Sequence, residues 1–72
     1  MTNTSLLKEY IRKSGYKLSY IAEYLGVDYR TLKNKIDNVS EFKASEIEKL
    51  CQLLHIDNLA ERQKIFFAPK VD

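Results

Sequence analysis

Residues 18–36 read LSYIAEYLGVDYRTLKNKI, and this pattern predicts two short helices that cross through a tight turn. Ala22 is a small residue at the position where the two helices would come closest. Gly26 follows four residues later and can adopt the positive φ that such a turn requires, because it has no Cβ. Leu32 comes six residues after Gly26 and can pack back onto the first helix. We therefore expect one helix to end just before Gly26 and the next to begin just after Asp28, which is a good N-cap.

Apolar residues also recur at helical spacing outside this segment. A first helix is expected over residues 4–14, with Asn3 or Thr4 as its N-cap and Gly15 as its stop. The third helix of the chain is expected over residues 29–36.

Two further helices are expected in the second half of the chain. The fourth carries an apolar stripe made of Phe42, Ala44, Ile47, Leu50, Cys51 and Leu54. Ser45 and Glu48 match the spacing of a capping box. The fifth is marked by Leu59, Ile65 and Phe66 and has a weaker pattern. No stretch alternates with a period of two, so we expect no strands.

These features predict an all-α fold, a compact bundle of four to five short helices with a central helix-turn-helix at residues 18–36. The 72 residues fit one domain, expected over residues 1–68, with a frayed tail at 69–72. Hydrophobic residues make up 44% of the chain, and it has only two glycines and one proline, which favours helix over disorder.

The composition argues against several other classes of protein. Cys51 is the only cysteine and cannot form an internal disulfide, and the lone His55 has no cluster of ligands around it, so we expect no metal and no cofactor. No set of residues converges on a catalytic site, so we expect neither an enzyme nor a small-molecule substrate. The chain has no apolar run near the roughly 20 residues of a membrane span. It also has no export signal at its start, so we expect it in the cytoplasm without a membrane partner.

Positive charge is concentrated in the first half of the chain. Residues 1–36 hold seven Lys or Arg and three Asp or Glu, whereas residues 37–72 hold five and seven. This asymmetry is consistent with one face that binds a polyanion, and also with ordinary surface charge. Residues 29–36 contain three cations and no acidic residue, a balance that suits nucleic acid.

The chain resembles the helix-turn-helix domains of the Cro/CI repressor family, the Xre-like group, over about residues 4–60. The segments TLKNKIDN at 31–38, EFKASEI at 41–47 and IFFA at 65–68 are similar to a narrower subgroup. That subgroup comprises small Cro-like regulators of temperate phages of Gram-positive bacteria, encoded opposite a CI-type repressor, such as the modulators of repression of lactococcal phages. The resemblance implies a lambda repressor-like fold and operator DNA as the partner.

The resemblance also implies which side chains contact DNA. The third helix would enter the major groove, where arginine can bind guanine and asparagine can bind adenine through paired hydrogen bonds. The start of the second helix would meet phosphate. The lysines of the third helix would bind either bases or phosphates. The implied DNA-contacting residues are Lys17, Ser19, Tyr29, Arg30, Lys33, Asn34 and Lys35.

The sequence departs from the family pattern at three positions near the expected DNA face. Leu18 stands where a polar residue, often glutamine, contacts phosphate in the family. Lys17 replaces the usual Ser or Thr cap. Asp28 caps the third helix but brings a carboxylate close to DNA. These departures favour a function other than DNA binding alone.

An alternative function is that of an antirepressor, which keeps the fold and acts by binding a CI-type repressor protein. Tyr20 and Tyr24 lie four residues apart on the second helix and flank its buried stripe. Tyrosine is favoured at protein interfaces, and these two form either such an interface or a half-buried surface pair. For the DNA-binding function we expect a homodimer, because one short helix reads too few base pairs for selectivity.

Overall fold

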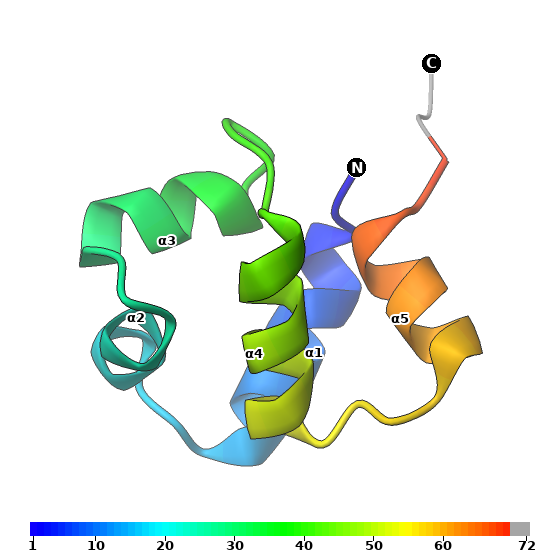
Figure 1. The fold of residues 1–72 in the computed structure, drawn as a ribbon, viewed down its shortest axis with the longest axis horizontal. Coiled ribbons are helices and arrows are strands. Elements are labelled where there is room, and N and C mark those ends of the chain that lie inside the picture. The colour runs from blue at the N-terminus through cyan, green and yellow to red at the C-terminus, as the bar shows by residue number, and fades with distance from the viewer. Residues whose placement is uncertain (70–72) are drawn as a thin grey trace.

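The computed structural model describes residues 1–69 and has five α-helices in that part of the chain (Figure 1). They are α1 (Thr4–Ser14), α2 (Leu18–Leu25), α3 (Tyr29–Ile36), α4 (Ala44–Leu54) and α5 (Leu59–Phe66), and no strand occurs among the described residues. The prediction of an all-α bundle is confirmed. The frayed tail expected at 69–72 lies, beyond Pro69, outside the described residues. Within residues 1–69, no helix combines the length and the apolar character needed to cross a membrane.

The helix starts follow from local side-chain chemistry. Asn3, rather than Thr4, caps α1, because its side chain accepts a hydrogen bond from the N–H of Leu6. Asp28 caps α3 in the same way, and its carboxylate accepts from the N–H of Thr31 at 2.7 Å. Each cap pairs one of the N–H groups that a helix start leaves without an intrahelical partner.

The connection between α2 and α3 spans only residues 26–28 and depends on Gly26. Gly26 has a φ of +77°, a left-handed conformation that costs other residues about 1–2 kcal/mol. The N–H groups of Gly26 and Val27 close the end of α2 by donating to its last carbonyls. Figure 1 shows α2 end-on and α3 side-on, so the two helices cross steeply, as the sequence predicts.

The apolar stripes of α4 and α5 are shorter than predicted. Ala44 begins α4 but is exposed, and Phe42 lies before the helix, where it is half-buried and packs edge-on against Phe66. Leu59 begins α5 and is 73% exposed, whereas Ile65 is fully buried. Ala44 and Leu59 are corrections with one cause, since the first residue of each helix faces solvent instead of the bundle.

The predicted capping box of Ser45 and Glu48 is wrong. The start of α4 is capped two residues earlier, because the N–H of Lys43 donates to the carboxylate of Glu46 at 2.8 Å. Glu46 is the third residue of the helix, and its negative charge also suits the positive end of the helix dipole.

The core lies along the middle of the bundle, where α1 and α4 lie between the α2–α3 pair and α5 (Figure 1). All five helices contribute to it, and the largest fully buried side chains are Leu7, Ile21, Leu32, Leu50, Cys51 and Ile65. Each fully buried aliphatic side chain contributes about 1.5–3 kcal/mol. The apolar side of α3 reaches this core through Leu32 and Ile36.

The N-terminal residues hold the end of α3. Asn38 follows that helix with a φ of +66° and exchanges two hydrogen bonds with Thr2. Its Oδ1 accepts from the Thr2 N–H at 2.9 Å, and its Nδ2 donates to the Thr2 carbonyl at 2.7 Å. The hydroxyl of Thr4 donates to the carbonyl of Ile36 at 2.6 Å. The position of α3 is therefore fixed at its C-terminal end as well as along its apolar side.

Candidate nucleic-acid interface

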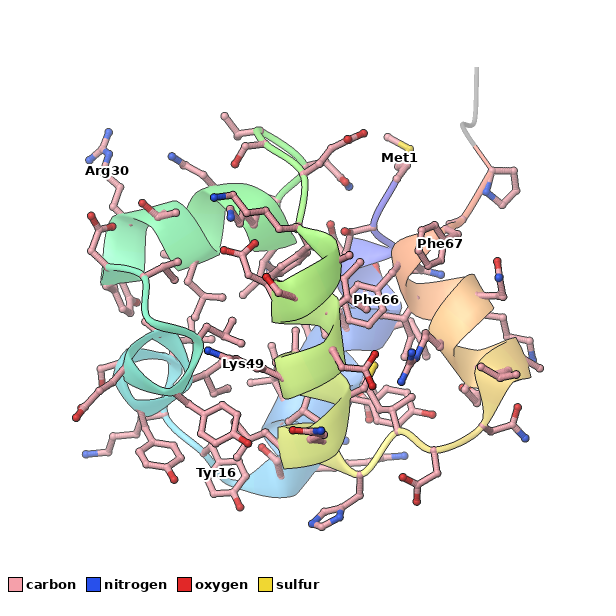
Figure 2. All side chains as sticks on the ribbon, in the orientation of Figure 1. Met1, Tyr16, Arg30, Lys49, Phe66 and Phe67 are labelled. Carbon is pink, nitrogen blue, oxygen red and sulfur yellow. The ribbon has the colours of Figure 1, made fainter. Side chains whose placement is uncertain are left out.

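One side of α3 packs on the core and the other side faces solvent. Leu32 is fully buried, whereas Tyr29, Arg30 and Lys33 are exposed. Figure 2 shows Arg30 pointing away from the bundle at the start of α3. Asn34 is half-buried, and its carbonyl accepts N–H groups from the loop that follows the helix. Two exposed cations and an aromatic ring on one short helix can contact a polyanion.

A carboxylate lies at the start of this side of α3. Asp28 is exposed, and hydrogen bonds from the backbone N–H and then the hydroxyl of Thr31 hold its pKa below the ordinary value. The positive charge of Arg30 acts in the same direction. Asp28 is therefore ionised at neutral pH and places one negative charge beside the exposed cations.

Lys35 is a correction to the predicted set of DNA-contacting residues. Only 9% of its side chain is exposed, and its ammonium lies 2.5 Å from Oε1 of Glu46, which is 8% exposed. Burial alone would raise the pKa of Glu46, but the hydrogen bonds from the Lys35 ammonium and the Lys43 N–H outweigh burial and lower that pKa. Lys35 therefore joins α3 to α4 inside the bundle, and its charge is not available to a ligand.

The start of α2 lies next in the predicted interface. Lys17 and Ser19 are exposed, and Leu18 between them is half-buried against the core. Lys17 occupies the N-cap position but makes no side-chain hydrogen bond to the helix. The first N–H groups of α2 therefore lack a side-chain cap, and such groups can bind phosphate.

These side chains form what we call the α3 surface, which consists of Lys17, Ser19, Tyr29, Arg30, Lys33 and Asn34.

No protein-family model, curated protein or solved structure matches this chain. Among residues 1–69, no three His, Cys, Asp or Glu side chains are placed to bind a metal ion.

A second surface carries tyrosines at a spacing of four residues. Tyr16, Tyr20 and Tyr24, which we call the tyrosine row, are 39%, 47% and 38% exposed. The ring centroids of Tyr16 and Tyr20 are 5.2 Å apart. Tyr16 is missing from the sequence prediction, although the regular spacing points to it. Figure 2 places Tyr16 on the opposite side of the α2–α3 pair from Arg30, so the tyrosine row begins away from the exposed cations of α3.

A groove that the sequence does not predict borders the α3 surface. It lies between α1, the start of α2 and α3, has a volume of about 210 Å³, and is lined by Lys8, Ile11, Arg12, Leu18, Lys33, Ile36 and Asp37. Its walls are almost entirely apolar, because the long cationic side chains present their aliphatic stems. Lys8 pairs with Asp37 at 3.7 Å, and Arg12 pairs with Glu9. Lys33 belongs to both the groove and the α3 surface.

Proposed function

We propose that this chain is a transcriptional regulator of phage type that binds operator DNA with α3. In this proposal α2 and α3 form a helix-turn-helix of the lambda repressor-like class, and the protein is a small Cro-like member of the Cro/CI family. It acts in the cytoplasm of a bacterial host, without a cofactor and without enzymatic activity. The observation that carries the proposal is the exposed side of α3, where Arg30 and Lys33 face solvent on a helix whose other side is fixed in the core.

The chemistry of each residue suggests its role. Arg30 is suited to guanine and Asn34 to adenine, whereas Lys33 is suited to phosphate or a base. Lys17 and Ser19 lie at the uncapped start of α2, where backbone N–H groups bind phosphate. Base contacts give selectivity, and phosphate contacts give affinity that falls with salt.

The size of α3 supports binding as a homodimer. Its eight residues are about 12 Å long at 1.5 Å per residue, which is the length of three to four base pairs. So short a site recurs too often to be selective. Two copies on a two-fold operator would double the length of sequence that is read.

Binding to DNA from the protein's own promoter region tests the proposal. Fluorescence anisotropy compares that DNA with a scrambled duplex at two salt concentrations. We expect selective binding that weakens steeply with salt. Arg30→Ala should lose about 1–3 kcal/mol of selectivity, roughly 5- to 150-fold in Kd. Lys64→Ala on α5 removes the same charge elsewhere and serves as the control. If Arg30→Ala and Lys64→Ala behave alike, the assigned surface is wrong.

The tyrosine row favours a second candidate function, that of an antirepressor that binds a CI-type repressor protein. Exposed tyrosines supply a large contact area and a hydroxyl, and they are enriched among the residues that dominate binding energy. Two of these rings already contact each other, so less side-chain freedom remains to be lost on binding.

Two tyrosine variants separate the two functions. Size exclusion of this protein with the purified CI-type repressor should give one heteromeric peak. Tyr20→Ala should disrupt that peak and leave DNA binding unchanged. Tyr29→Ala removes an equally large exposed ring from α3 and should have the opposite effects. Two independent peaks with the unmodified protein would exclude the antirepressor function.

A further inference from the structure

The groove beside the α3 surface has the size of a site for a single side chain. Its volume is about 210 Å³, below the roughly 300–1,000 Å³ of most sites for small molecules and cofactors. Ile11, Leu18 and Ile36 give it apolar walls, and its rim carries more cations than carboxylates. Such a site fits one bulky apolar side chain with acidic neighbours.

This chain itself presents such a side chain at the start of α5. Leu59 is 73% exposed and so contributes little to the core. Asp57 lies two residues before it and is exposed, whereas the carboxylate of Glu61 accepts from the Tyr10 hydroxyl and pairs with Lys64. An exposed leucine next to a carboxylate is complementary, in both polarity and charge, to an apolar groove with a cationic rim.

The groove and Leu59 cannot meet within one molecule. Figure 1 shows the α2–α3 pair at one end of the longest axis and α5 at the other, and that axis measures 31 Å. We infer that the protein self-associates head to tail, with Leu59 of one copy inserted into the groove of the next and Asp57 facing Lys33. The contact also brings the basic first half of one copy, which holds most of the groove, against the acidic second half of the next, which holds Leu59.

A head-to-tail contact joins two different surfaces, so a pair of copies keeps one free groove and one free leucine. Such assemblies grow into open chains unless the rotation between copies closes a ring. The contact also covers Lys33, so association and binding through the α3 surface exclude each other. This last consequence alone rests on the proposed DNA-binding function, and the association itself does not.

Sedimentation velocity over a micromolar to millimolar range of concentration tests the inference without DNA. The average mass of the unmodified protein should rise with concentration. Leu59→Ser removes the inserted side chain, and Lys33→Glu places a carboxylate opposite Asp57. Both residues are exposed, so both variants should fold, which circular dichroism verifies. Each should weaken association at least about tenfold. Val39→Ser is the matched control, since Val39 is also 73% exposed.

Mixing the two variants gives the decisive result. The Leu59→Ser protein keeps its groove and the Lys33→Glu protein keeps its leucine, so together they should form a one-to-one complex that grows no further. The inference is overturned if the unmodified protein stays monomeric, or if Leu59→Ser has no more effect than Val39→Ser. It is also overturned if the mixture of variants stays monomeric.

Discussion

Replacing Glu46 by glutamine tests how α3 is held in place. The substitution keeps the size of the side chain and an oxygen that can accept from the Lys43 N–H. It removes the negative charge from a pair in which both side chains are less than one tenth exposed. The ammonium of Lys35 then remains inside the bundle without a counter-charge.

The expected loss of stability is large for a domain of this size. Removing one partner of a buried ion pair costs about 3–5 kcal/mol. A domain of 72 residues has a total stability of about 4–11 kcal/mol. We expect a loss near 3 kcal/mol, because the small exposed part of Lys35 lets its ammonium shift toward water. At 4–8 °C per kcal/mol, this corresponds to a fall in Tm of about 12–24 °C.

Urea denaturation followed by circular dichroism measures the free energy of unfolding, and a double variant is the control. Lys35→Met with Glu46→Gln removes both charges, so we expect it to lie within about 1 kcal/mol of the unmodified protein. A loss below about 1 kcal/mol for Glu46→Gln alone would refute the reasoning. So would equal losses in the single and double variants, because removing the unpaired ammonium would then restore no stability.

The pH dependence supplies a second check on the same pair. The pKa of Glu46 is lowered in the folded protein, so its contribution is complete above the unfolded value of about 4.3. That contribution is lost as the pH falls through the folded value. The difference in stability between the unmodified protein and Glu46→Gln should therefore shrink as the pH is lowered from about 6 to about 3. If the difference in stability stayed constant over this pH range, the lowered pKa of Glu46 would not be the source of its contribution.

Four further substitutions test the backbone and the core by the same denaturation assay. Gly26→Ala should cost about 1–2 kcal/mol because of the positive φ. No atom beyond the adjoining residues lies within 4 Å of an added Cβ, so a larger loss would show that the positive φ is not the cause. Leu32→Ala removes a fully buried side chain and should cost about 3–5 kcal/mol. Asn38→Gly keeps the left-handed backbone and loses the bonds to Thr2, so we expect a loss of about 1–3 kcal/mol. Asn38→Ala should cost more than Asn38→Gly, because alanine is strained at the positive φ of this position. Equal losses for the two variants would argue against that strain.

The features that sequence predicts well are those set by neighbouring residues. Gly26 and Asp28 act on the turn that they occupy, and both have the predicted role. Leu32 and Ile36 are four residues apart, and the helix repeat alone places them on one side. The all-α fold is predictable for this reason, and the steep crossing of α2 and α3 follows from a three-residue turn.

The features that sequence misses depend on residues far apart in the chain. Lys35 lies beside the buried Ile36, so its position on the helix hints at burial, but its charge favours the surface. Only Glu46, eleven residues away, makes that burial possible. The groove likewise needs three helices to be in place before it exists. The exposure of Leu59 depends on where the first turn of α5 lies against the bundle, which the weak pattern of that helix does not specify. The DNA contacts of α3 stay predictions.

Because Cys51 is buried, the reactivity of its thiol reports how often the folded protein opens. Cys51 is the only cysteine and is 1% exposed. Burial raises the pKa of its thiol, and the nearby Arg62 opposes this only in part. The thiolate is the nucleophile that attacks an alkylating reagent, so modification must wait until α4 separates from its neighbours. When closing is faster than modification, the labelling rate measures the equilibrium population of the open form. Thiol reactivity therefore gives the free energy of opening in the native protein, without denaturant and without an introduced probe.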